Sequence, residues 1–214
     1  MTRWGHEKAV RALGAGLLWA AVAGCAGIHG SYESQRARYE LPAPAPDRVT
    51  VCHGYGCVFR AEVSLSPEDR AEIAALFTPA PADAAAERAA ITRAIARFEE
   101  TIGPRSGTAN DAPGTFGSLG MRGQQDCVDE MLNTAAYLTL LEEWGLLSFH
   151  TPYRRVTATF FEQGFWPHTA ATLRERASGA EYVVDSWVYA NGAPPIIAPI
   201  DAWRDNSYRT LATR

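Results

Sequence analysis

Three side chains suited to nucleophilic catalysis occur in order along the second half of the chain: Cys127, His168 and Asp185. A thiol attacks a carbonyl carbon when a nearby imidazole takes its proton, and a carboxylate fixes the tautomer of that imidazole. The order of nucleophile, base and orienting acid therefore predicts an acyl-transfer enzyme that needs neither a metal nor a cofactor.

The predicted elements would bring these three side chains together. Cys127 opens an apolar helix predicted over 127–144, directly after a loop rich in Gly, Ser, Asn and Pro. The start of a helix favours a thiolate, because backbone N–H groups and the helix dipole stabilise negative charge there. His168 and Asp185 lie in strand-like segments, 166–173 and 181–189, with a turn at 177–180 between them. The turn would make these two segments an antiparallel pair of strands. The register of that pair decides whether the carboxylate of Asp185 contacts the imidazole of His168.

Simpler interpretations exist for the same residues. Cys127 in a helix can be a buried, inert thiol, and a single histidine is more often structural than catalytic. His150 is a rival base, but it falls in a predicted loop just before Pro152.

The two other cysteines after residue 25 frame a predicted β-hairpin. Strand-like segments end at Cys52 and begin at Cys57, with His53-Gly54-Tyr55-Gly56 between them. The two thiols would face each other across the turn, which predicts a Cys52–Cys57 disulfide. The alternative is a metal site with His53 as third ligand, although the spacing fits no common zinc pattern.

The residues around the three catalytic candidates resemble the transglutaminase-like superfamily. The matching runs are Asp126-Cys127-Val128-Asp129-Glu130, Pro167-His168-Thr169-Ala170-Ala171 and Val183-Val184-Asp185-Ser186-Trp187. The resemblance is closest to bacterial transglutaminase-like cysteine peptidases, which are periplasmic. It implies an α+β fold of the papain/transglutaminase kind, in which the cysteine helix packs on an antiparallel sheet. It also implies that Gln124 or Gln125 could donate to an oxyanion.

The chain departs from the family pattern near the cysteine. Glu130-Met131 and Thr169 stand where other residues are usual. Asp126, Asp129 and Glu130 also crowd the helix start with negative charge, which disfavours a thiolate. Asp126 as N-cap and Asp129 as its capping-box partner would give these acids a structural role. Nearby acids can bind calcium in the peptidase branch, but no oxygen-rich loop is evident here.

The N-terminus resembles a bacterial lipoprotein signal. A basic start is followed by an apolar, uncharged stretch over 15–24, which is short for a membrane span. Val22-Ala23-Gly24-Cys25 matches a lipobox, so Cys25 is predicted to be lipidated after removal of residues 1–24. Ala26 favours sorting to the outer membrane, facing the periplasm. An ordinary signal peptide and an uncleaved anchor are the alternatives.

The predicted mature chain consists of a tether and one domain. Residues 25–47 form a lipidated, Pro-rich tether, and 48–214 form a single domain. Helices are predicted from Ser66 to about Phe77 and from Ala84 to about Ile102, and the tail from Ala190 is predicted to be loop. The chain after residue 24 contains 17 basic and 23 acidic residues, which gives a net charge of −6 with histidine neutral. This balance argues against nucleic acid as a partner.

Two functions follow from these observations. The favoured one is an envelope-anchored thiol enzyme that hydrolyses peptide or isopeptide bonds of an envelope protein or peptide. The alternative is a catalytically inactive transglutaminase-like lipoprotein that binds an envelope partner.

Overall fold

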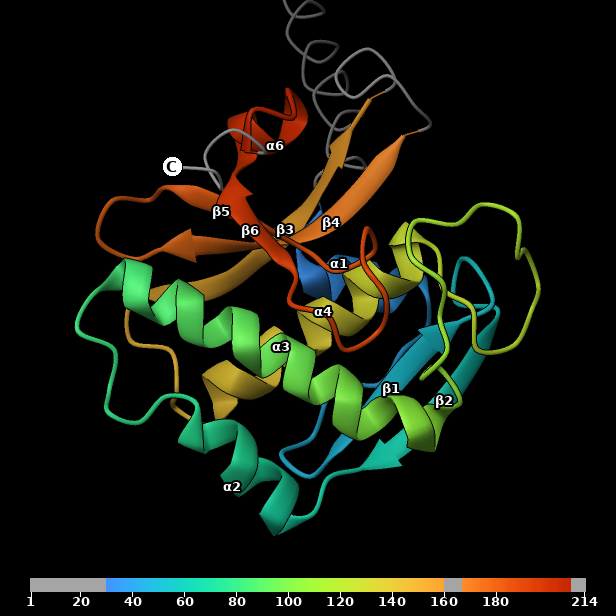
Figure 1. Ribbon diagram of the computed structural model, residues 1–214, viewed down its shortest axis with the longest axis horizontal. Helices are drawn as coiled ribbons and strands as arrows, with labels where there is room; N and C mark the ends of the chain where they lie inside the picture. The colour runs from blue at the N-terminus through green and yellow to red at the C-terminus, as the bar shows by residue number, and fades with distance from the viewer. Residues whose placement is uncertain (1–29, 160–166, 209–214) are drawn as a thin grey trace, which may run out of the picture.

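The computed structural model describes residues 30–159 and 167–208. This part of the chain is an α+β fold in which helices pack against two antiparallel sheets (Figure 1). The helices are α1 (Tyr32–Arg38), α2 (Pro67–Ala75), α3 (Ala84–Ser106), α4 (Cys127–Glu143) and α6 (Ile200–Arg204). The strands are β1 (Arg48–His53), β2 (Phe59–Ser64), β3 (His150–Ala158), β4 (His168–Glu175), β5 (Glu181–Asp185) and β6 (Ile196–Pro199).

Helix α4 lies at the centre of the molecule. It contacts β1 of the two-stranded sheet and β3, β4 and β5 of the four-stranded sheet, and α3 covers another side (Figure 1). Its leucines and alanines are buried in the main core between these elements. Burial on several sides explains why its sequence is apolar almost throughout.

The four-stranded sheet has the order β3-β4-β5-β6, and all neighbours are antiparallel. One face contributes Ala171, Leu173 and Val184 to the core around α4. The opposite face forms a smaller core with α6, which includes Val156, Val183 and Trp203. The sheet is therefore covered on both faces.

Most predicted elements are confirmed. Both strands of the hairpin are present, and Ser66 caps α2 with a capping box to Asp69. Helix α3 runs beyond the predicted end at Ile102 and stops at Gly107, whose φ of 83° is in the left-handed region. His150, which is predicted to lie in a loop, instead begins strand β3 (His150–Ala158), and the register of this strand shifts between Pro152 and Arg155.

Two expectations about the end of the chain are wrong. The strand predicted to reach residue 189 ends at Asp185, because Ser186 turns into a buried polar network with Thr134 and Glu130. The tail predicted to be loop contains β6 and α6. Ile196–Pro199 add a fourth strand along β5, and Trp203 is buried beneath the sheet.

Part of the segment predicted to be a tether is folded onto the domain. Helix α1 contacts β3 and α4, and Leu41 after it is buried. Gly30 accepts a hydrogen bond from the backbone N–H of Arg155 in β3. Residues 1–29, which include the predicted signal peptide and Cys25, lie outside the described residues.

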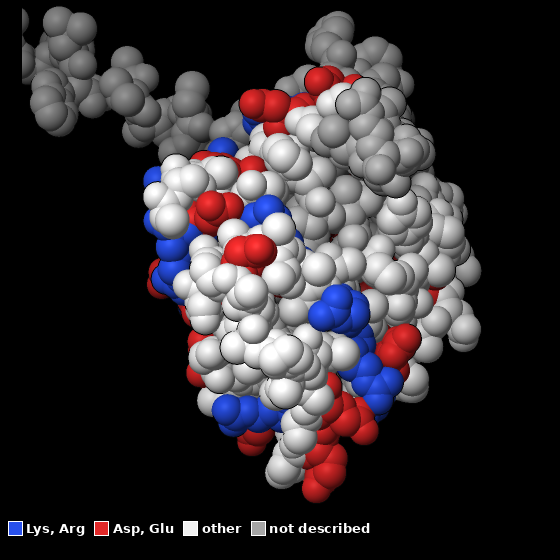
Figure 2. Space-filling view, turned by 60° about the vertical axis from the view of Figure 1, so that its left-hand side comes forward, with Lys and Arg blue, Asp and Glu red and all other residues white. Residues whose placement is uncertain are grey.

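Charged side chains of both signs are interspersed on the face that lies to the left in Figure 1 (Figure 2). Exposed pairs include those of Arg97 on α3 with Glu72 on α2 and with Glu100 on α3. Exposed pairs of this kind contribute little to stability.

Candidate active site

Cys127 is the first residue of α4, as predicted. Asp126 caps the helix: its Oδ1 accepts hydrogen bonds from the N–H groups of Val128 (3.0 Å) and Asp129 (2.9 Å). Asp129 returns the bond by accepting from the Asp126 N–H (3.2 Å), which completes the predicted capping box. Cys127 is 7% exposed and is the free cysteine of the described residues. The capping residues Asp126 and Asp129 therefore determine where α4 begins, and this places the Cys127 thiol in the first turn of the helix.

His168 and Asp185 meet across the predicted antiparallel pair. His168 begins β4 and Asp185 ends β5, and the register pairs Ala171 with Val184. His168 Nε2 donates to Asp185 Oδ2 at 2.7 Å, with both side chains 2% exposed. The same Oδ2 accepts from Trp203 Nε1 at 2.8 Å. The carboxylate is thus held by a second, indole donor from α6.

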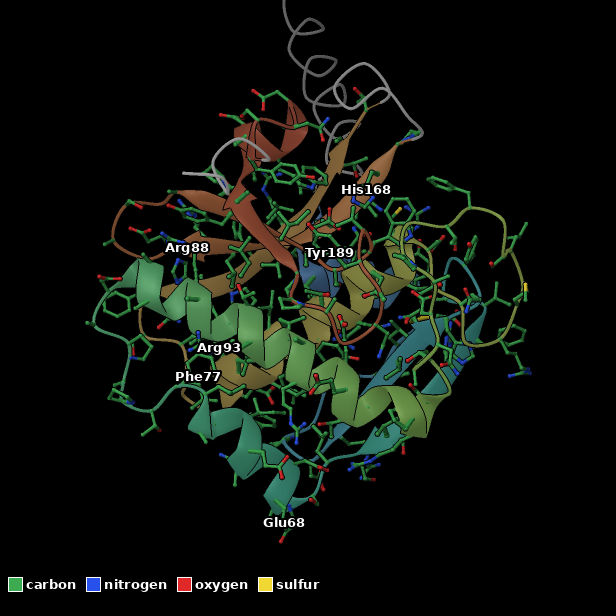
Figure 3. All side chains as sticks on the ribbon, in the orientation of Figure 1. Glu68, Phe77, Arg88, Arg93, His168 and Tyr189 are labelled. Carbon is green, nitrogen blue, oxygen red and sulfur yellow. A yellow bond between two sulfur atoms is a disulfide. The ribbon has the colours of Figure 1, made fainter. Side chains whose placement is uncertain are left out.

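The imidazole of His168 also interacts with the side chain of Cys127. Burial disfavours the imidazolium, but the charge and hydrogen bond of Asp185 and the contact with Cys127 outweigh it and raise the pKa of His168 to about 9. Because Nε2 is bonded to Asp185, Nδ1 is the nitrogen that can exchange a proton with the thiol. His168, which is labelled in Figure 3, lies on β4. Trp187 and Trp203 pack on its ring, with centroids 4.7 and 5.4 Å away.

The acids near the helix start are buried rather than solvated. Burial and then the charge of Asp126 raise the pKa of Asp129 to about 7. Burial and the charge of Glu99 raise the pKa of Glu130 well above its usual range. Burial likewise raises the pKa of Glu99 to about 8 and that of Asp111 to about 7. Protonation lowers the negative charge that the sequence places beside the thiol, so these acids oppose a thiolate less than expected.

Both glutamines suggested as oxyanion donors bond elsewhere. Gln124 Nε2 donates to the carbonyl of Asn110 at 3.0 Å and thereby holds the preceding loop. Gln125 is buried, and its Nε2 is 3.4 Å from the carbonyl of Cys52. The backbone N–H of Cys127 lies at the helix start, where N–H groups lack intrahelical acceptors.

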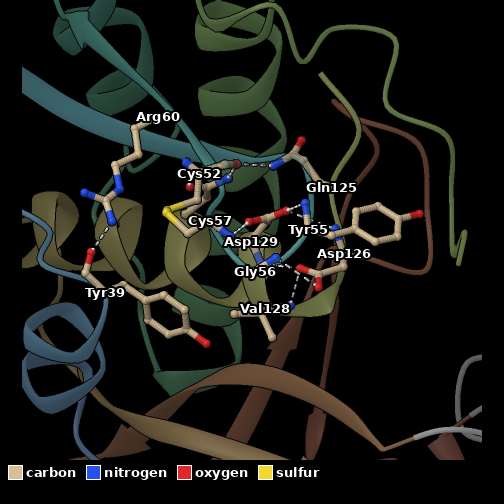
Figure 4. Close-up of a disulfide and its surroundings, with 11 residues drawn as sticks. Tyr39, Cys52, Tyr55, Gly56, Cys57, Arg60, Gln125, Asp126, Val128 and Asp129 are labelled. Carbon is tan, nitrogen blue, oxygen red and sulfur yellow. Dashed lines mark hydrogen bonds between the residues drawn. A yellow bond between two sulfur atoms is a disulfide. The ribbon is translucent and has the colours of Figure 1, made fainter. Parts of the chain in front are cut away.

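The predicted disulfide is present between Cys52 and Cys57. Asp129 accepts from the backbone N–H groups of Tyr55 (2.8 Å) and Cys57 (2.6 Å), and Asp126 accepts from that of Gly56 (3.1 Å) (Figure 4). The four residues 54–57 all have positive φ. The acids of α4 therefore hold a tight left-handed loop over the helix start.

The metal alternative does not suit this arrangement. Among the described residues, Cys52, Cys57 and Asp129 form a group with potential ligand atoms within 4.8 Å of one another. The sulfurs are oxidised to a disulfide, whereas zinc is bound by thiolates. His53 instead accepts from the Gly123 N–H through Nδ1 at 3.1 Å. Both carboxylate oxygens of Asp129 accept hydrogen bonds from backbone N–H groups, those of Tyr55 and Cys57.

His150 lies at the other end of the sheet from His168. The register pairs His150 with Glu175 at one end and His168 with Ala158 at the other. The ring of His150 is fully buried, with Nδ1 2.9 Å from Glu87 and Nε2 3.1 Å from Arg88. This histidine belongs to a structural network.

Arg155 is a further residue that interacts with the thiol, and no motif in the sequence singles it out. It lies on β3 opposite Ala171 and so faces α4, where it lines a small cavity with Met131, one turn after Cys127. Its guanidinium interacts electrostatically with Cys127, while burial lowers the pKa of Arg155. The register shift at the start of β3 sets which face this side chain takes, and that irregularity could not be predicted from strand periodicity.

Comparison with protein-family models, with curated proteins and with solved structures gave no match. Within the described residues, none of the helices is long and apolar enough to cross a membrane. Function therefore has to be inferred from the geometry of the side chains.

Proposed function

We propose that this protein is an envelope-anchored thiol acyl-transfer enzyme that hydrolyses peptide or isopeptide bonds. Cys127 would be the nucleophile, His168 the base and Asp185 the orienting acid, in an arrangement of the papain/transglutaminase kind. The observation that carries the proposal is the buried 2.7 Å bond from His168 to Asp185, with the same imidazole in reach of a thiol at a helix start.

The geometry suits a two-step reaction. In the free enzyme the Cys127 thiol has passed its proton to His168, and Sγ of the resulting thiolate forms a bond to the substrate carbonyl carbon. The tetrahedral intermediate then collapses, the C–N bond breaks, and the amine leaves with the proton from His168. Water attacks the resulting thioester as His168 takes a water proton, and the carboxylic acid leaves as the thiol is restored.

Two further features serve this chemistry. The raised pKa of His168, about 9, keeps the imidazole protonated at neutral pH and so available as a partner for a thiolate. The Cys127 backbone N–H is a donor for the oxyanion, as expected at a helix start. Hydrolysis is favoured over cross-linking, because transamidation requires that water be kept away from the thioester.

The anchoring part of the proposal depends on the N-terminal sequence. Cys25 follows a basic start and an uncharged apolar stretch, as in bacterial lipoproteins. Two or more acyl chains on that cysteine would hold the chain firmly to a bilayer. We place the protein at the outer membrane, facing the periplasm, on the basis of Ala26.

A second candidate function is supported by the burial of Cys127. A thiol that is 7% exposed gives a bulky substrate little access, and buried carboxyls surround the helix start. These features suit a catalytically inactive relative that binds an envelope partner. A thiol with ordinary reactivity would favour this function.

Peptide cleavage provides the test of the enzyme proposal. The full-length chain in detergent micelles is incubated with a peptide library, and new termini are identified by mass spectrometry. Cleavage that Cys127→Ala and His168→Ala both reduce by orders of magnitude is expected. Equal cleavage by the wild type and Cys127→Ala would contradict the proposal.

A further inference from the structure

The large exposed apolar side chains of the described residues lie on three loops. They are Val58 (63% exposed), Phe116 (50%), Leu119 (77%), Met121 (57%) and Tyr189 (47%). Val58 follows the disulfide loop, and the next three lie in the loop before Cys127. Tyr189, which is labelled in Figure 3, lies in the β5–β6 connection after Asp185. We refer to these five side chains as the apolar rim.

Hydrogen bonds join the three loops around the start of α4. Tyr55 Oη lies 2.8 Å from the carbonyl of Thr115, and the Gly120 N–H donates to the carbonyl of Gly54 at 3.2 Å. The Gly114 N–H donates to the carbonyl of Trp187 at 2.8 Å. The apolar rim is therefore held in place rather than carried on independent loops.

The apolar rim is continuous with the candidate active site. The ring of Phe116 packs edge-on against Trp187, with centroids 4.9 Å apart. Trp187 in turn packs against His168 at 4.7 Å. An apolar ligand on Phe116 would therefore lie two aromatic rings from the imidazole.

The segments that carry the rim are poor in charged residues. Residues 52–58, 112–121 and 186–195 contain no Asp, Glu, Lys or Arg, although 21% of the whole chain is charged. The loop before Cys127 also contains Asp111, which is buried, and Arg122, which is exposed directly after Met121. Such a surface gives a charged peptide few partners and desolvates its charges at a cost. It stabilises large apolar side chains by removing them from water.

We infer that the apolar rim binds the substrate segment next to the scissile bond, and that this segment is an uncharged peptide with large apolar side chains. The inference rests on the proposed function, because it assigns the substrate class of that same site. Phe116, Leu119 and Met121 are its specificity-determining residues.

Three peptide vinyl sulfones test this assignment on the full-length chain in micelles. The probes differ only in the two residues before the reactive group, which are Leu-Leu, Glu-Glu or Lys-Lys. Sγ of Cys127 adds to the β-carbon, and the α-carbon takes the proton from His168, so no group leaves. The Leu-Leu probe is expected to label Cys127 at least about tenfold faster than the charged probes.

Variants of the rim show whether that preference arises there. Leu119→Ser and Phe116→Ser are expected to remove most of the preference, whereas the matched variants Leu119→Met and Phe116→Leu keep it. Iodoacetamide is too small to reach the rim, so its alkylation rate reports on the thiol alone, and the labelling rate of each probe is divided by that rate in every variant. This reagent separates the two proposals, since slow alkylation of the wild type contradicts the catalytic function itself.

Three results would overturn the inference while leaving the catalytic proposal intact. One is rapid alkylation by iodoacetamide with equal labelling by the three probes. A second is a dimer in sedimentation analysis that Leu119→Ser dissociates, which would assign the rim to a second copy. The third is binding to phosphatidylglycerol vesicles by the wild type that Leu119→Ser abolishes, which would assign it to lipid.

Discussion

Asp185 accepts hydrogen bonds from side chains on two different elements, His168 on β4 and Trp203 on α6. The charge of this carboxylate is what allows a buried imidazole to stay protonated. Burial alone disfavours the imidazolium, so the raised pKa of His168 depends on Asp185.

Asp185→Asn keeps the shape of the side chain and removes its charge. We expect the pKa of His168 to fall well below about 9, because burial is the largest single effect on it and the charge of Asp185 no longer opposes burial. An NMR titration of the His168 ring measures this value. Asp205→Asn, at an exposed acid, is the control and is expected to change nothing. A pKa that stays near 9 in Asp185→Asn would contradict this explanation.

Arg155 supplies positive charge on the side of Cys127 that faces β3. Arg155→Gln is expected to slow alkylation of Cys127 at neutral pH by about three- to tenfold, because a thiolate loses a favourable charge. Arg155→Lys retains the charge and should retain most of the rate. Arg154→Gln is the matched control, since the guanidinium of Arg154 pairs with Glu181. Equal rates in Arg155→Gln and the wild type would exclude an electrostatic role.

At the scale of elements, Asp129 joins α4 to the disulfide loop. Its carboxylate accepts from the N–H groups of Tyr55, Cys57 and Asp126 while being fully buried. Burying such donors without an acceptor is costly. The acid therefore explains how residues 54–57 are held with positive φ.

Asp129→Ala is expected to lower the free energy of unfolding by about 3 kcal/mol or more, since three N–H groups lose their acceptor. Denaturant unfolding measures the change. Asp129→Asn keeps one acceptor oxygen and should cost less. The control is Asp83→Ala, which removes an exposed helix cap and should cost about 1 kcal/mol. A loss at Asp129 no larger than at Asp83 would show that this loop does not depend on the carboxylate.

The same elements show what the sequence could predict. The caps of α2 and α4, the hairpin and the β4–β5 pair follow from local residue patterns, so Cys127, His168 and Asp185 could be placed on their elements. Strand β6 and helix α6 could not be predicted, because Ile196–Pro199 acquire their strand form by pairing with β5. Trp203 and Arg155 were missed for the same reason: each reaches the site through long-range packing.

At the scale of the whole molecule, buried acids give the fold an unusual dependence on pH. Burial raises the pKa of Glu99 to about 8, and Asp111 and Asp129 reach about 7. A folded pKa above the unfolded one gives stability that is present at low pH and is lost as the pH rises through the folded value. His168, at about 9, acts in the same direction.

The midpoint of thermal unfolding is therefore expected to fall by several degrees between about pH 5 and pH 9. Glu99→Gln has no titrating group at position 99, so its unfolding midpoint should fall by less over the same pH range. Calorimetry over this range measures both proteins, and it starts above the acidic region where the lowered pKa of Asp69, about 2, acts in the opposite direction. A midpoint that is constant or rises with pH would contradict the buried-acid explanation.

Cys127 and His168 are proposed to act as a pair, and this pairing can be tested by the pH dependence of Cys127 alkylation by iodoacetamide. The full-length chain is compared with His168→Ala, and Cys127→Ala gives the background from other groups. We expect rapid alkylation that persists below about pH 7 and is lost in His168→Ala, because an imidazolium stabilises a thiolate. Alkylation that rises only near pH ~8.5, as for an ordinary thiol, and is unchanged in His168→Ala would contradict this pairing.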